Sequence, residues 1–129
     1  MKSLIPLTVL AGACAACTAG PAPGARDEQA LAAELAERVE GEGQRCIASS
    51  PSRALAYGDR RTILYREGRT LWVNRLDAEC PGLGPHATLI VETNGSSYCH
   101  GDRVRALPSG SSIPSPTCIL RDFVPYRKP

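Results

Sequence analysis

The chain has 129 residues, a length that allows one domain rather than two. Its formal charge of +2 at pH 7 and its aromatic content of 5% argue against nucleic-acid binding, which needs a concentrated basic face or a row of stacking rings. Thirteen of the 15 basic residues are Arg, a side chain suited to carboxylate and phosphate pairing. We therefore expect no nucleic-acid partner, and the composition alone assigns no activity.

Residues 1–17 are typical of a secretory signal. A positive charge at Lys2 precedes a short apolar run over residues 4–11, and small residues follow. This run is too short to span a bilayer as a stable helix. Its end resembles a bacterial lipobox, in which small residues precede a cysteine that is lipidated and becomes the mature N-terminus. Cys17 is the preferred lipidation candidate, and Cys14 is the alternative.

The signal predicts where the protein is located. A lipidated cysteine would anchor the chain to a membrane, and no acidic residue follows either cysteine to favour retention in the inner membrane. We therefore expect an exported protein in the periplasm, held on the outer membrane by its lipid. Ordinary cleavage near Ala19 is the alternative and would give a soluble periplasmic or secreted protein. Residues 18–26 are rich in Gly and Pro and predict an extended, flexible tether.

A single helix is predicted over residues 27–43. Asp27 can cap its N-terminus, and Gly41 and Gly43 can end it. Apolar residues recur at i, i+4 and i+8, at Leu31, Leu35 and Val39. Residues 26–45 hold three basic and six acidic side chains, a net charge of −3. We expect a peripheral helix that lies on the domain, and a partner-binding helix is the alternative.

Residues 45–129 predict a mainly β domain, a small antiparallel sheet curled into a sandwich or an open barrel. The predicted strands cover 55–57, 62–66, 70–74, 88–92, 97–99, 103–107 and 118–124. Gly68 favours a hairpin between the second and third of these, and Asn94-Gly95 favours one between the fourth and fifth. Pro125 should end the last strand, and the Ser-, Gly- and Pro-rich segment 108–116 should be a surface loop.

Four cysteines remain once two are assigned to the signal, and they are Cys46, Cys80, Cys99 and Cys118. An even number in a small exported domain predicts two disulfides, because a domain of this size buries too little surface to be very stable on its core alone. The sequence leaves three connectivities open. We favour Cys46–Cys118, which would join the start and end of the domain, with Cys80–Cys99, which would brace the central strands.

The grouping of Cys99, His100 and Asp102 is the one that suggests chemistry. A free Cys99 thiolate with His100 or His86 as base could act as a nucleophile, but the even cysteine count argues against a free thiol. A turn at residues 100–102 explains the same residues. None of the four cysteines lies within four residues of another, which argues against a zinc site. We therefore expect no catalytic residue, no metal and no cofactor.

A resemblance to a known family covers residues 45–126. The cysteine frame carries it, together with Cys99-His100-Gly101-Asp102 and the C-terminal Phe123-Val124-Pro125-Tyr126. The segment resembles an uncharacterised family of small exported proteobacterial proteins, a domain of unknown function. His100 and Arg121 stand where members of that family more often carry Arg and Gly. The resemblance implies export and disulfides and brings no activity.

Together these observations favour a non-enzymatic lipoprotein of the cell envelope that serves as a binding or structural module. Its expected partners are the membrane, through the N-terminal anchor, and an envelope protein or a cell-wall component. The alternative is a periplasmic thiol- or metal-dependent activity centred on Cys99 and His100.

Overall fold

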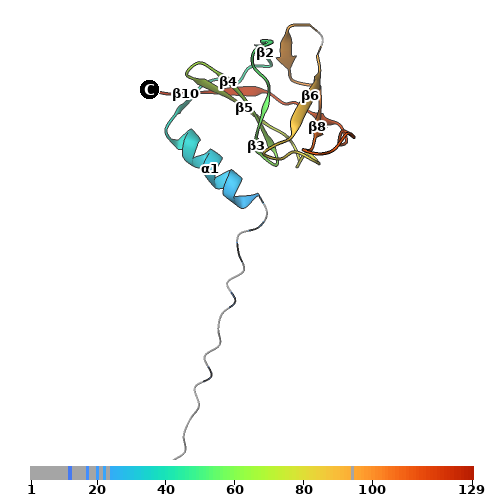
Figure 1. The fold of residues 1–129 in the computed structure, drawn as a ribbon. Coiled ribbons are helices and arrows are strands. Elements are labelled where there is room, and N and C mark those ends of the chain that lie inside the picture. Colours follow the sequence, from blue (N-terminus) through green and yellow to red (C-terminus); the bar gives the residue numbers. More distant parts are fainter. Residues whose placement is uncertain (1–11, 13–16, 18–19, 21, 23, 94) are drawn as a thin grey trace, which may run out of the picture.

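The structure is a computed structural model that describes residues 12, 17, 20, 22, 24–93 and 95–129 (Figure 1). One helix, α1 (Ala25–Ala36), precedes ten strands that form three antiparallel sheets. The prediction of a mainly β chain with antiparallel sheets and one N-terminal helix is confirmed, and the sheets are open rather than closed. Within the described part of the chain, no helix has the length and apolar character needed to cross a membrane.

The largest sheet has five strands, in the order β1 (Val39–Glu40), β10 (Phe123–Arg127), β5 (Thr70–Arg75), β4 (Thr62–Glu67) and β3 (Ala56–Asp59). The predicted hairpin at Gly68 is confirmed. Strands β4 and β5 pair along their full length, with Glu67 opposite Thr70, and Gly68 has the positive φ of 58° that the tight turn requires. This hairpin forms the centre of the molecule.

Two smaller sheets complete the fold. One pairs β2 (Cys46–Ala48) with β7 (Ser97–Cys99), and the other has the order β6 (Thr88–Glu92), β8 (Arg103–Leu107) and β9 (Cys118–Ile119). The hairpin predicted through Asn94-Gly95 is wrong, because β6 pairs with β8 and β7 pairs with β2. Pairing with β8 places the inner residues of β6 opposite buried Val104 and Ala106, so burial of apolar side chains overrides the local turn signal.

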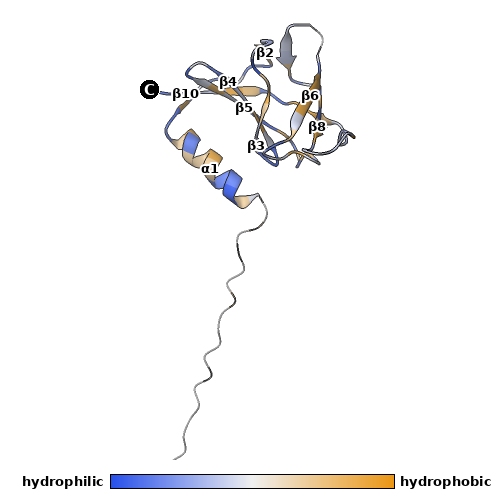
Figure 2. Ribbon diagram, in the orientation of Figure 1, coloured by the Kyte–Doolittle hydropathy of each residue, from blue (hydrophilic) through white to orange (hydrophobic). Residues whose placement is uncertain are grey.

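The central hairpin is buried on both faces. Ile63, Tyr65, Trp72 and Phe123 project from one face into the core shared with the two smaller sheets. Leu64, Leu71 and Val73 project from the other face and pack against Leu31 and Leu35 of α1. Figure 2 shows the mixture of hydrophilic and hydrophobic residues along α1 that suits a helix with one buried stripe. The helix therefore covers part of the sheet, as the prediction of a helix lying on the domain stated.

The helix boundaries differ from the predicted range of 27–43. The helix begins at Ala25 after Gly24, which has a positive φ of 86°, so Asp27 lies inside the first turn and is not the cap. It ends at Ala36, and Val39 and Glu40 instead form β1 at the edge of the large sheet. Val39 is 61% exposed and takes no part in the stripe. Val39 is β-branched, a type of side chain that favours strands, and it pairs with Arg127 of β10. The spacing of apolar residues along a helix gives no information about such a pairing.

The last predicted strand, 118–124, is split into β9 and β10, and β10 continues through Pro125. The carbonyl oxygen of Pro125 accepts a hydrogen bond from the backbone N–H of Gly41 at 2.7 Å. The N and C=O of one residue in a strand face the same neighbour, so the missing N–H of Pro125 also falls on the β1 side, where regular pairing has just ended. Proline is therefore tolerated inside β10, because its opposite side carries the pairing with β5.

Two disulfides form among the four cysteines, as predicted, but the favoured connectivity is wrong: Cys46 bonds to Cys99, and Cys80 bonds to Cys118. Cys46 and Cys99 lie opposite each other in the β2–β7 pair, with a Cα–Cα distance of 4.0 Å. The ladder bond is made by their neighbours, His100 N–H to the Arg45 carbonyl at 2.6 Å, so the two cysteines occupy a non-hydrogen-bonded position, where side chains approach most closely. Strand register therefore decides the pairing.

Candidate binding cleft

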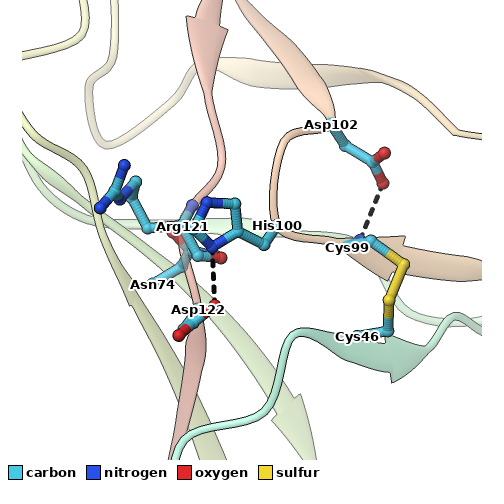
Figure 3. The surroundings of a disulfide bond; sticks show 7 residues. All are labelled: Cys46, Asn74, Cys99, His100, Asp102, Arg121 and Asp122. Carbon is cyan, nitrogen blue, oxygen red and sulfur yellow. Dashed lines mark hydrogen bonds and ion pairs between the residues drawn. A yellow bond between two sulfur atoms is a disulfide. The ribbon is translucent and has the colours of Figure 1, made fainter.

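The residues that suggested chemistry in the sequence do not converge in the fold. Cys99 Sγ is held in the disulfide with Cys46. Asp102 Oδ2 accepts a hydrogen bond from the Cys99 backbone N–H at 2.8 Å, while His100 Nδ1 lies 2.7 Å from Asp122 Oδ1 (Figure 3). The N–H of Asp102 returns to the Cys99 carbonyl at 3.0 Å, and Gly101 between them has a φ of 93°. The interpretation of residues 100–102 as a turn is therefore confirmed.

The remaining sequence candidates lie apart from this turn. His86 is exposed in the loop between β5 and β6. Cys17, the preferred lipidation candidate, is exposed and is a free cysteine among the described residues, whereas Cys14 lies outside them. No group of three or more His, Cys, Asp or Glu side chains that could hold a metal ion occurs in the described segments.

A cleft of about 270 Å³ lies on the face of the large sheet that α1 only partly covers. Val73 and Arg75 alternate with Asn74 along β5, so both project to this face, and Val124 and Tyr126 do the same on β10. The full lining comprises Glu40, Val73, Arg75, His100, Arg121, Asp122, Val124 and Tyr126. Five polar or charged side chains thus surround a floor of two valines and one tyrosine, which makes this cleft more polar than most small-ligand sites.

Asn74 positions the rim of the cleft from the opposite face of β5. Its side chain is fully buried, Nδ2 donates to the Arg121 carbonyl at 2.7 Å, and Oδ1 accepts from the Arg121 N–H at 2.8 Å. These two bonds fix the segment between β9 and β10 to β5, so that Arg121 and Asp122 lie beside His100 (Figure 3). Sequence reasoning missed Asn74. The available signal was an amide inside an otherwise apolar strand, where a buried polar group requires partners.

The cations of this region differ in how far they are already paired. Arg121 Nη1 lies 3.1 Å from Asp77 Oδ2, and Arg61 Nη2 donates to the Asp77 carbonyl at 3.0 Å. Arg75 is exposed and makes no ion pair or side-chain hydrogen bond with any residue that the structure describes. The Arg75 guanidinium therefore has all of its donors free for a ligand.

A second cleft, of about 390 Å³, adjoins the first because Arg75 lines both. It lies between α1 and the end of the sheet at Thr62. Asp59 lines it and is only 6% exposed, with Oδ1 accepting the Arg61 backbone N–H at 2.8 Å. The Arg75 side chain thus forms part of the wall of both clefts.

Polar contacts hold α1 on the sheet beside these clefts. Both carboxylate oxygens of Glu34 bond to Arg66, at 2.6 and 3.1 Å, and this pairing lowers the pKa of Glu34. The Tyr57 hydroxyl donates to Asp27 Oδ2 at 2.7 Å. Burial, followed by this hydrogen bond and the charge of Asp27, raises the pKa of Tyr57 to about 12. Acidic side chains of α1 therefore bond to a guanidinium and to a hydroxyl group of the large sheet.

Comparisons of the whole chain with family models, curated proteins and solved structures gave no match. Function must therefore be argued from the residues and their geometry.

Proposed function

We propose that the protein is an exported lipoprotein of the cell envelope whose β-domain is a non-enzymatic binding module, with the cleft at Arg75 as its contact surface. The pairing of all four cysteines of the β-domain in two disulfides is the observation that carries this proposal. Disulfides persist in oxidising compartments such as the bacterial periplasm, and small exported domains use them to supplement a small core. The secretory pattern of residues 1–17 is consistent with the same compartment.

The position of Cys17 supports the anchored form of the proposal. This cysteine is exposed and precedes the first residue of α1, Ala25, by eight positions. Eight residues in extended conformation reach at most about 28 Å. A lipid on Cys17 would therefore keep the β-domain close to the surface of the outer membrane, where envelope proteins and cell-wall components are within reach.

Binding rather than catalysis is supported by the partners of the residues that suggested chemistry, of which only His100 lines the cleft. His100 is paired with Asp122, Cys99 is bonded to Cys46, and Asp102 caps a backbone N–H. A nucleophile needs a base within hydrogen-bond reach and an orienting third group, and these three side chains each contact a different partner. What remains available is a free guanidinium over an apolar floor, which is a recognition surface.

Two experiments test this proposal. Membrane fractionation of cells that produce wild-type, Cys17→Ser and Cys14→Ser protein should find the wild type and Cys14→Ser in the outer membrane and Cys17→Ser released or unprocessed. Outer-membrane protein that is unchanged by both substitutions would contradict lipid anchoring.

The binding function is tested by a photo-crosslinking amino acid placed at Val124 in the cleft, with Ile113, which is 75% exposed in the loop after β8, as the matched control. The proposal expects a discrete adduct from position 124 in living cells and none from position 113. Absence of any adduct from position 124 would contradict binding at the cleft and favour a purely structural role.

A further inference from the structure

We infer that the cleft at Arg75 binds the free carboxyl terminus of a peptide, and this inference rests on the proposed binding function. Three features of the cleft carry it: a guanidinium with no internal partner, an apolar floor of limited size, and acidic side chains on the remaining wall. Each feature restricts the class of ligand in a different way.

The free guanidinium indicates a carboxylate. Arg121 and Arg61 both bond to Asp77, by its carboxylate and its carbonyl respectively, so their donors are partly used. Arg75 has no such partner among the described residues. A guanidinium presents parallel N–H groups that match the two oxygens of a carboxylate, and such paired, charge-assisted bonds are stronger than neutral ones.

The floor limits the size of the ligand. Val73 is 1% exposed and lies opposite Val124 in the β5–β10 pairing, and the ring of Tyr126 lies on the same face. The volume of about 270 Å³ falls just below the range of roughly 300–1,000 Å³ that holds drug-sized molecules. One or two residues at the end of a chain fill such a space, with an apolar last side chain on the two valines.

The acidic wall distinguishes a peptide end from other anions. Glu40 and Asp122 line the same cleft as Arg75 and Arg121, and Arg121 is already paired with Asp77, so a ligand with several negative charges, such as a phosphorylated headgroup, would meet repulsion as well as attraction. A peptide end carries one carboxylate and adjacent backbone N–H groups, and carboxylate side chains can accept hydrogen bonds from these N–H groups. A sugar would favour a broader aromatic platform than the single ring of Tyr126.

The test uses acetyl-alanyl-alanine in its L,L and D,D forms, each as the free acid and as the C-terminal amide. Affinity for the mature protein in detergent micelles is measured by ligand-observed NMR. We expect at least one free acid to bind, its amide to bind at least tenfold more weakly, and Arg75→Gln to lose affinity for the acid by a similar factor. Arg75→Lys, which keeps the charge without the paired donors, should show an intermediate loss.

The matched control is Arg105→Gln, because Arg105 lies on β8 of a different sheet and its side chain donates a hydrogen bond to Thr117, outside the cleft. Its affinity should stay within twofold of the wild type. Preference for the L,L acid would indicate protein C-termini as the source, and preference for the D,D acid would indicate the D-residue-ended peptides of the cell wall.

Equal binding of acid and amide, unchanged affinity in Arg75→Gln, or binding of none of the four compounds would each overturn the inference. A different result would contradict the proposed binding function. If the crosslinked adduct from position 124 persists in the Arg75→Gln protein while the dipeptides do not bind, the cleft is a binding surface for a different ligand. If no adduct forms in the wild type either, the binding function itself is contradicted.

Discussion

At the residue scale, the geometry of the cleft depends on Asn74, because its amide bonds to both backbone groups of Arg121. Replacement by Ala would leave these groups without their partners, at a cost of about 1–3 kcal/mol each. Because both hydrogen bonds are only part-buried, each cost should fall in the lower part of this range, and we predict that Asn74→Ala lowers the free energy of unfolding by about 2–4 kcal/mol in urea denaturation. Thr93→Ala removes only an exposed hydrogen bond and is the control, with an expected change within about 0.5 kcal/mol. Equal stability of the two variants would contradict the role given to Asn74.

The raised pKa of Tyr57 predicts a loss of stability at alkaline pH. Its pKa is about 12 in the folded protein against an ordinary value of about 10 for an exposed tyrosine, so between these values the folded chain keeps a proton that the unfolded chain has lost. The contribution of Tyr57 is therefore fully present below pH 10 and decreases as the pH rises towards 12. Tyr57→Phe lacks the hydroxyl that bonds to Asp27, so it should be about 1 kcal/mol less stable than the wild type at pH 8.

This deficit should shrink when unfolding is measured at pH 11, because only the wild type loses the contribution of the Tyr57 proton. A spectrophotometric titration should show one fewer late-titrating phenol in the variant. A deficit that is the same at both pH values would show that the hydroxyl and Asp27 are not coupled.

At the element scale, whether a structure could be predicted depends on how far apart in the sequence the interacting residues lie. The β4–β5 hairpin was predictable because strand pattern and the Gly68 turn lie within one short segment and agree. The absence of a hairpin at Asn94-Gly95 was not predictable, because β6 passes over its neighbour β7 and pairs with β8, which packs Leu89 and Val91 against the core. Local signals determine a turn only where burial favours the same pairing.

The cleft was less predictable than the strands. Arg75 and Tyr126 are brought to one face by the pairing of β5 with β10, which are separated by about 50 residues of chain, and nothing local to either strand indicates the partner. The disulfide pairing had the same difficulty, since Cys46 and Cys99 meet through the register of β2 with β7. The count of four cysteines predicted that disulfides form, and only the register determines which ones.

The connectivity can be checked by mass spectrometry of non-reduced protein cut with trypsin and a glutamate-specific protease, since cleavage after Glu92 separates Cys80 from Cys99. We predict that residues 46–53 remain joined to 93–103 and that 80–92 remain joined to 106–121. Bonds that close loops of 53 and 38 positions are each worth about 4 kcal/mol in the loop-entropy model, so either paired Cys→Ser variant should unfold at much lower denaturant. A free, reactive thiol at Cys99 would contradict this pairing and favour a thiol-dependent activity.

At the scale of the whole molecule, the small formal charge of +2 conceals two parts of opposite sign. The segment 26–45 has a net charge of −3, whereas 11 basic and seven acidic residues from position 46 onward give +4. The two parts meet at the pair of Glu34 with Arg66, over the apolar contact of Leu31 and Leu35 with the sheet. The helix is therefore part of the folded domain, and it begins at Ala25, inside the range 18–26 that was predicted for the tether.

We propose that this domain is exported, lipidated and closed by two disulfides. The intact mass of the protein purified from its native envelope tests all three points in one measurement. We predict a mature chain that begins at Cys17, carries acyl chains, and weighs four hydrogens less than its reduced form. A chain with ordinary cleavage and no lipid, or one that gains no hydrogens on reduction, would contradict it.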